Sequence, residues 1–278
     1  MYESFYDLRE KPFTILPDPD LIYWGRMHSM AFTMLEFGVM NNAGFTVITG
    51  EIGSGKTTLL RYLLKKISPS ITVGLISNSP QGRQELLQWI LMSVGEPFDG
   101  EYPQLFKRLH DFLLGQFANG RRTILIIDEA QNLEPEALEH LRMISNINAD
   151  KFQILQLILV GQPQLRDLLL APKLHQFAQR ISSDFHLTPL DPAEVEKYIN
   201  FRLQSVGGRQ PLFTPEACAL IAAASGGVPR MINVLCDTAL VYGFANDQKL
   251  IGERLVKDVI ADKQQYSIFP VKRVARVP

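Results

Sequence analysis

Residues Gly50 to Thr57 read Gly-Glu-Ile-Gly-Ser-Gly-Lys-Thr, which is the complete pattern of a phosphate-binding loop. Glycines let the backbone of such a loop curl so that its N–H groups point inward at phosphate oxygens. The apolar residues 43–49 before the loop predict a buried strand, and residues 58–64 after it predict a helix. A strand, a loop and a helix in this order bring the positive end of the helix dipole to the anion.

The sequence therefore predicts which residues hold a nucleotide. Lys56 is the candidate cation for the β- and γ-phosphates, and the Thr57 hydroxyl is the candidate Mg²⁺ ligand. The alternative interpretation is an ordinary glycine turn between a strand and a helix. The predicted phosphate-contacting run consists of Gly50, Glu51, Ile52, Gly53, Ser54, Gly55, Lys56, Thr57 and Thr58.

Composition limits the class of protein and its partners. The chain has 278 residues, of which 46% are hydrophobic, and this is enough for a large core and two domains. Its net charge of −1 gives no reason to expect nucleic acid or an anionic membrane surface as a partner. No stretch of about 18 apolar residues predicts a transmembrane helix. The acidic start of the chain has no signal-peptide pattern, so we expect a cytoplasmic protein.

Cysteine and histidine usage argues against a disulfide and against a metal centre built from protein ligands alone. Cys218 and Cys236 lie in apolar helical stretches and are predicted to be buried thiols. The five histidines show no metal-ligand spacing.

Apolar runs alternate with helical patterns in the first part of the chain. After the strand at 43–49, further strands are predicted at residues 72–77, 123–128, 154–160 and 184–187. Helices are predicted at residues 26–40, 84–94, 102–118 and 135–146. Buried strands that alternate with helices imply an α/β fold, with a parallel five-stranded sheet covered by helices on both faces.

The character of the sequence changes after Pro189, where strand patterns stop. Asp191-Pro192 and Thr214-Pro215 are helix starts with a capping residue followed by proline. Two further helices are predicted near residues 228–244 and 253–263. The expected parts are a linker and helix at 1–42, a phosphate-loop α/β core at 43–189, a small all-helical domain at 190–265 and a flexible basic tail at 266–278.

A second set of predicted site residues follows the strand at 123–128. Asp128 and Glu129 emerge where this apolar strand ends, beside the phosphate loop. We assign Asp128 to Mg²⁺ and Glu129 to the water that attacks a γ-phosphate. A solvated acidic pair at a strand end is the alternative interpretation.

Three more polar residues are candidates for contact with a triphosphate. Gln162 ends the next apolar strand, where it can reach the γ-phosphate; the alternative is a turn residue before a proline. Arg180 lies before the fifth strand and can act on the γ-phosphate of a neighbouring subunit, or else cap its own helix. Arg230 lies in the first turn of a helix, where a cation opposes the dipole. It is therefore a candidate reporter of bound nucleotide, with a surface salt bridge as the alternative.

The order of these features resembles the AAA+ ATPases over about residues 25–265. Closer still, the chain is similar to the GspA/ExeA branch, which includes MshM-like and exosortase-associated members. The stretches that carry this resemblance are Tyr-Asp-Leu-Arg-Glu-Lys-Pro-Phe at 6–13, Pro-Asp-Pro at 17–19, Asp-Glu-Ala-Gln-Asn-Leu at 128–133, Gly-Gln-Pro-Gln-Leu at 161–165, Ala-Gln-Arg-Ile at 178–181 and Gly-Gly-Val-Pro-Arg-Met-Ile-Asn at 226–233.

The resemblance implies roles for single residues and for the whole chain. It makes Gln162 the first sensor, Arg180 the arginine finger and Arg230 the second sensor, on a helical lid domain. It also implies that the stretch around Tyr23 lies near the adenine. The expected protein binds ATP and Mg²⁺, hydrolyses ATP and assembles with itself in a ring or filament. Its expected client is a secretion, pilus or polysaccharide-export component, through which it can be peripheral at the inner membrane.

Two other functions remain as alternatives. A DNA-associated AAA+ ATPase of the transposon target-selection type is supported only by Arg121-Arg122 and the basic tail, and the net charge weakens it. The other alternative is a scaffold that binds nucleotide but hydrolyses it negligibly. Glu129 argues against this alternative, because a protein that only binds nucleotide has no need of a water-orienting acid.

Overall fold

The computed structural model describes residues 1–77, 80, 82–149 and 152–266. The chain forms two compact units. The helical unit contains residues 1–28, 53–61 and 188–278, and the sheet unit contains residues 29–52 and 62–187. Of the predicted basic tail at 266–278, only Tyr266 belongs to the described residues.

The sheet unit is built on a five-stranded parallel sheet, which confirms the α/β fold class. The strands lie in the order β2-β3-β6-β1-β7, and every neighbouring pair is parallel. Strand β1 therefore lies between β6 and β7, next to two strands that come much later in the chain. The strands are β1 (Phe45–Gly50), β2 (Ile71–Ile76), β3 (Arg122–Ile127), β6 (Leu155–Gly161) and β7 (Ile181–Leu187), with a separate hairpin of β4 (Asn148–Ala149) and β5 (Phe152–Gln153).

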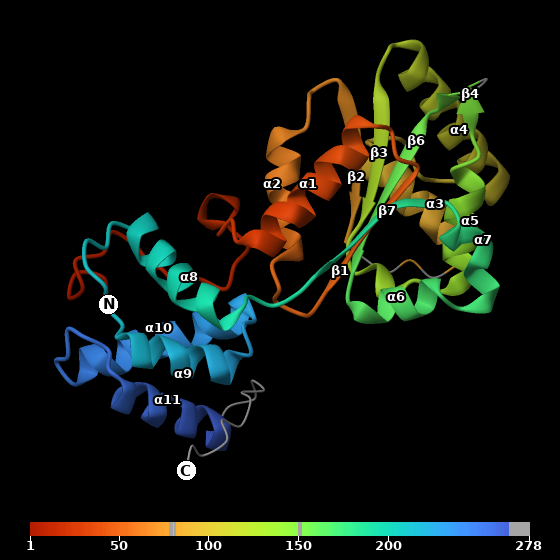
Figure 1. The fold of residues 1–278 in the computed structure, drawn as a ribbon. Helices are drawn as coiled ribbons and strands as arrows, with labels where there is room; N and C mark the ends of the chain where they lie inside the picture. The colour runs from red at the N-terminus through yellow and green to blue at the C-terminus, as the bar shows by residue number, and fades with distance from the viewer. Residues whose placement is uncertain (78–79, 81, 150–151, 267–278) are drawn as a thin grey trace. The chain divides into compact units, whose positions relative to one another are not determined.

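Helices cover both faces of this sheet. In Figure 1, α1 lies on one face and α3, α4 and α5 lie on the other. Helices α1 and α2 each run from one unit into the other. The helical elements are α1 (Arg26–Met40), α2 (Lys56–Lys66), α3 (Arg83–Ser93), α4 (Tyr102–Ala118), η2 (Ala130–Asn132), α5 (Pro135–Ile144), α6 (Pro163–Leu169), η3 (Pro172–Leu174) and α7 (His175–Ala178).

Alternate residues of the strands face two different packing layers. On one face, Phe45 and Leu157 belong to the apolar core that α3, α4 and α5 complete. On the other face, α1 approaches so closely that a Cβ on Gly38 would stand 2.5 Å from Thr46 Oγ1. The side chain of Gln156 also donates to the Gly38 carbonyl at 2.7 Å. Burial on both faces explains why these strands read as continuous apolar runs.

Strand β7 is longer than its apolar pattern indicates. The sequence predicts residues 184–187, whereas the strand begins at Ile181. The hydroxyls of Ser182 and Ser183 donate to the carbonyls of Phe45, at 3.2 Å, and Met34, at 3.5 Å. Polar side chains that are paired with backbone carbonyls can occupy a strand without any apolar signature, and sequence patterning misses them.

The helical unit combines the C-terminal helices with the start of the chain. Tyr2, Tyr6 and Phe13 are buried in the core of these helices. Arg202 Nε donates to the Pro12 carbonyl at 2.7 Å, so the extended segment is also fixed by buried polar contacts. The elements are η1 (Pro19–Leu21), α8 (Pro192–Ser205), α9 (Pro215–Ser225), α10 (Pro229–Ala245) and α11 (Glu253–Tyr266).

The cysteines of the helical unit are free and buried, as predicted. Burial raises the pKa of Cys218 to about 12 and also raises the pKa of Cys236. Neither thiol therefore supplies a thiolate nucleophile near neutral pH. Within the part of the chain that the structure describes, no helix is long and apolar enough to cross a membrane.

Candidate nucleotide site

The predicted phosphate loop, Gly50 to Thr57, leads from β1 into α2. Gly53 and Gly55 adopt φ angles of 80° and 103°, in the left-handed region where a side chain is strained. Helix α2 begins at Lys56, and this residue is only 7% exposed. The loop therefore combines curled backbone, a lysine and the N–H groups of a first helical turn, which together suit an anion.

Arg230 also reaches the phosphate loop, through its backbone. It lies in the first turn of α10, and its N–H donates to the Gly53 carbonyl at 3.2 Å. A Cβ on Gly53 would stand 2.5 Å from the Cβ of Arg230. The glycine is therefore needed both for its backbone conformation and for the close approach of α10.

His28 touches the same loop, and sequence reasoning missed it. This residue lies in the first turn of α1, and its Nε2 is 2.9 Å from the Ser54 carbonyl oxygen. Burial lowers the pKa of His28 below its ordinary value. A lone histidine on a helix carries no motif, so only the fold reveals this contact.

The carboxyl ends of three strands meet at one edge of the sheet, because β1, β3 and β6 are adjacent and parallel. Gly50 ends β1, Asp128 follows β3 and Gln162 follows β6. Asp128 is buried, and its backbone N–H donates to the Ile76 carbonyl at 2.8 Å. This edge therefore carries the start of the phosphate loop, a carboxylate and an amide.

Glu129 has an unusual backbone for a residue with a side chain. Its φ is 54°, in the left-handed region, and its N–H donates to Asp128 Oδ1 at 3.0 Å. Such a conformation costs roughly 1–3 kcal/mol in a non-glycine residue and clusters at functional sites. The chain therefore leaves the extended conformation of β3 within two residues of the end of the strand.

Two amide side chains hold the Glu129 carboxylate. Gln131 Nε2 donates to Glu129 Oε2 at 2.8 Å, and Gln162 Nε2 donates to the same oxygen at 3.1 Å. The Gln162 backbone N–H in turn donates to Gln131 Oε1 at 2.8 Å. The structure thus brings together Glu129 and Gln162 and adds Gln131, whose place two residues after the acid is the only signal the sequence offered.

Arg180 and Tyr23 make contacts within their own units. Arg180 Nη1 donates at 2.9 Å to the hydroxyl of Ser145, which is buried at the end of α5. The Tyr23 ring packs against the rings of Tyr198 and Phe201, with centroids 5.8 and 5.7 Å away. Neither contact involves another predicted site residue.

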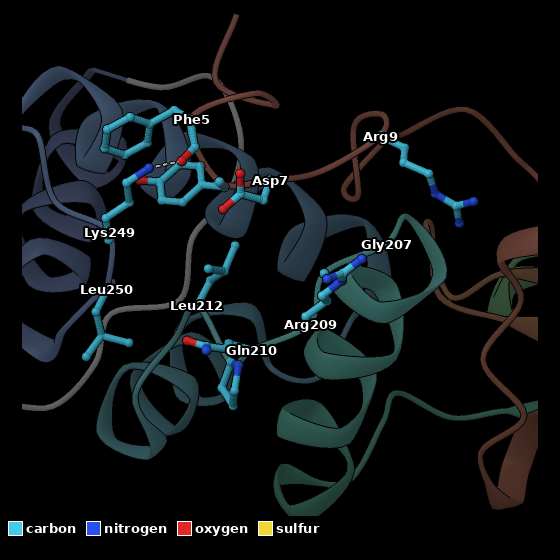
Figure 2. Close-up of a pocket in the computed structure, with 12 residues that line it drawn as sticks. Phe5, Asp7, Arg9, Gly207, Arg209, Gln210, Leu212, Lys249 and Leu250 are labelled. Atoms are coloured by element: carbon cyan, nitrogen blue, oxygen red, sulfur yellow. Dashed lines mark hydrogen bonds between the residues drawn. The ribbon is translucent and has the colours of Figure 1, made fainter.

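A separate groove of about 1000 Å³ lies in the helical unit (Figure 2). Its lining includes three cations, Arg9, Arg209 and Lys249, and one carboxylate, Asp7. Lys249 is held by the carbonyl of Phe5 and lies over its ring, 3.7 Å from the centroid. The groove is therefore basic, and none of the residues predicted to bind nucleotide lines it.

The candidate metal ligands fit Mg²⁺ by their chemistry. The Thr57 hydroxyl and the Asp128 carboxylate both offer oxygen, the donor that Mg²⁺ prefers. Among the described residues, no group of three or more His, Cys, Asp or Glu side chains is arranged to hold a metal. Mg²⁺ that accompanies a nucleotide needs no such cage, because phosphate oxygens and waters complete its shell.

Comparison with known proteins decides the family. Residues 39–169 match the family described as AAA domain. General secretion pathway protein A of Aeromonas hydrophila is 40% identical over 247 residues, which cover 88% of this chain and 45% of that relative. The chain is a GspA/ExeA-type AAA+ protein. It spans less than half of the length of the curated relative that it matches.

Comparison with solved structures supports the fold. The Aeropyrum pernix ORC2 protein in its ADP form gives a TM-score of 0.63 at 19% identity, over 88% of this chain and 70% of that chain. Drosophila ORC bound to DNA gives a TM-score of 0.66 at 17% identity, over 95% of this chain and 66% of that chain. At these identities the likeness establishes the P-loop fold alone.

Proposed function

We propose that this AAA+ protein binds ATP with Mg²⁺ and hydrolyses it. The observation that carries the proposal is the Glu129 carboxylate, fixed by Gln131 and Gln162 at the sheet edge where the phosphate loop begins. A protein that only binds nucleotide needs the loop but has no use for an oriented carboxylate. The nucleotide-binding scaffold is therefore the weaker hypothesis.

Each residue of the site has a proposed role in binding. The backbone N–H groups of the phosphate loop, together with Lys56, hold the β- and γ-phosphates. Thr57 and Asp128 would hold Mg²⁺, which neutralises charge on the phosphate oxygens when bound. Tyr23 is proposed near the adenine, and Arg230 is proposed to link bound nucleotide to the C-terminal helices through α10.

Hydrolysis is proposed to use the acid and the amide that contact each other. A water attacks the γ-phosphorus while the bond between that phosphorus and the bridging oxygen of ADP breaks. Glu129 accepts a proton from this water. Gln162 orients the water through its side-chain amide, which in this structure donates to Glu129. The products are ADP and inorganic phosphate.

Replacing the acid tests this step directly. Glu129→Gln is expected to lower the ATPase rate by about 10²–10³-fold, because general-base catalysis is removed. Its affinity for a fluorescent ADP analogue should stay within about threefold of wild type, because the phosphate loop is untouched. Glu134→Gln, at an exposed position after the same strand end, is the matched control. An undiminished rate in Glu129→Gln contradicts the proposal.

We also propose that the protein works as an assembly in which Arg180 of one copy acts on the nucleotide of the next. The ATPase rate per subunit should then rise with protein concentration, and Arg180→Ala should remove that rise. Ser145→Ala, which removes the intramolecular partner of Arg180, should keep it. A rise that persists in Arg180→Ala assigns the arginine a structural role in its own subunit.

The client is proposed from the relative's name, General secretion pathway protein A. We propose that ATP turnover drives the assembly or remodelling of a secretion, pilus or polysaccharide-export component. On this proposal the protein works in the cytoplasm and reaches the inner membrane through its partner. Co-purification with that machinery, dependent on ATP and lost in Lys56→Ala, is the expected result.

Binding to DNA is the second candidate, and the basic groove is the observation that favours it. Arg9, Arg209 and Lys249 can contact phosphates, whereas Asp7 in the same lining opposes them. Binding of a duplex DNA probe that weakens steeply with salt, and is lost in Arg209→Glu, would support this candidate. Absence of binding at low salt removes it.

A further inference from the structure

His28 has the geometry of a group that holds the phosphate loop in shape. The residue is 5% exposed, and its Nε2 lies 2.9 Å from the Ser54 carbonyl oxygen. A carbonyl only accepts, so Nε2 carries the hydrogen and the ring is neutral when Nδ1 is bare. Nδ1 is buried and has no hydrogen-bond partner among the described residues. A Cβ on Gly55 would stand 2.9 Å from Nε2, so the motif glycine makes room for the ring.

Two consecutive carbonyls of the loop are held by donors from outside it. The Arg230 N–H donates to the Gly53 carbonyl, and His28 donates to the Ser54 carbonyl. In a trans peptide, the C=O of one residue and the N–H of the next point in opposite directions. Fixing these carbonyls therefore also fixes the N–H groups of Ser54 and Gly55, which point to the opposite side of the loop backbone.

The first turn of α1 is itself anchored to helix α8. Glu194, in the first turn of α8, accepts the Arg26 N–H at 3.1 Å and the Asp191 N–H at 3.4 Å. A Cβ on Gly25 would stand 2.8 Å from the same carboxylate. His28 is two residues after Arg26, so α8 sets where the turn that bears the imidazole begins.

We propose that His28 is a positioning residue that holds the phosphate loop in its anion-binding shape, and that Glu194 couples this hold to helix α8. The proposal rests on nucleotide binding at the loop, as proposed above. The proposed role acts through the Ser54 carbonyl, which the imidazole contacts, and involves no bond from the ring to the nucleotide. Without this donor, the Ser54–Gly55 peptide can rotate. Part of the free energy of phosphate binding is then consumed in ordering that peptide, and the affinity falls.

The test compares nucleotide affinity across four full-length variants. His28→Phe keeps a ring but loses the donor, His28→Gln keeps a donor, and Glu194→Ala removes the anchor. His110→Phe is the same change at a partly exposed histidine on α4. Affinity is measured by titration with a fluorescent ADP analogue, and KM and kcat are measured separately. Loss of one hydrogen bond predicts about five- to tenfold weaker binding in His28→Phe, with kcat at saturating ATP within about twofold.

The other variants make the result specific. His28→Gln should recover most of the affinity, His110→Phe should match wild type, and Glu194→Ala should weaken binding by about two- to fivefold. Wild-type affinity in His28→Phe overturns the inference while leaving the proposed function intact. Absence of nucleotide binding in the wild-type chain overturns both. If His28→Phe does not fold, Glu194→Ala decides, and unchanged affinity there overturns the coupling.

Discussion

The phosphate loop and the acidic strand end, Asp128-Glu129, solve the same problem in different ways. Both turn the chain sharply at the carboxyl edge of the sheet. In the loop, the left-handed positions 53 and 55 are glycines, and donors outside the loop hold its carbonyls. At the strand end, the left-handed position is Glu129 itself, and amides hold its side chain. One region presents its backbone to a ligand and the other presents a carboxylate.

The difference explains why one region has a strong sequence signature and the other has a weak one. A loop that works through its backbone needs glycine wherever φ is positive, which restricts the sequence severely. A turn that works through a carboxylate must keep the acid and tolerate the strain, which costs roughly 1–3 kcal/mol. Packing and hydrogen bonds around Glu129 offset that cost, and these contacts leave no pattern in the sequence.

Among the variants that probe this comparison, the largest effect is expected from adding a side chain to the loop. Gly53→Ala places a Cβ 2.5 Å from that of Arg230 at a φ of 80°. Strain of roughly 1–3 kcal/mol corresponds to about 5–150-fold weaker binding of the ADP analogue. Gly95→Ala is the matched control, because its φ is 79° and no described atom lies within 4 Å of the added Cβ. Equal ADP affinity in the two variants contradicts the proposed role of the loop backbone.

A smaller effect is expected at the acidic strand end. Gln131→Met keeps the length of the side chain but removes its hydrogen bonds to Glu129 and to the Gln162 N–H. We expect the ATPase rate to fall about three- to tenfold while ADP affinity is unchanged, because one donor to the carboxylate remains. Gln164→Met, at an exposed position on α6, is the control. A weakened ADP affinity with an unchanged rate would reverse the contrast between the two regions.

The smallest expected effect is a pH dependence of stability through His28. Its pKa is lowered in the folded protein by burial, from an ordinary value of about 6.5. The unfolded chain therefore binds this proton more readily, so the free energy of unfolding falls as pH drops below about 6.5 and is unaffected by His28 above it. Thermal unfolding of wild type and His28→Gln between about pH 5 and 8 should show a flatter profile in the variant. Parallel profiles would mean that His28 titrates alike in both states.

Much of the fold follows from the sequence because burial on both sheet faces forces continuous apolar runs. Helices α1 and α4 begin and end at the residues predicted, and four of the five sheet strands lie within one or two residues of their apolar runs. Strand β7 was underpredicted because its serines are satisfied by backbone carbonyls. The sequence also did not predict that the N-terminal segment packs into the helical core, because Tyr2, Tyr6 and Phe13 follow no helical or strand period.

The sequence alone predicts the family, the α/β class, the phosphate loop and the acids that follow β3. It could do so because a backbone that cradles phosphate and a strand buried on both faces each admit few residue types. The contacts of His28 and Arg230 with the loop carbonyls, and of Gln131 and Gln162 with Glu129, become visible only in the folded chain. Except for Gln131, which is two residues from Glu129, these contacts join residues far apart in the chain, and a hydrogen bond between such residues leaves no local sequence pattern.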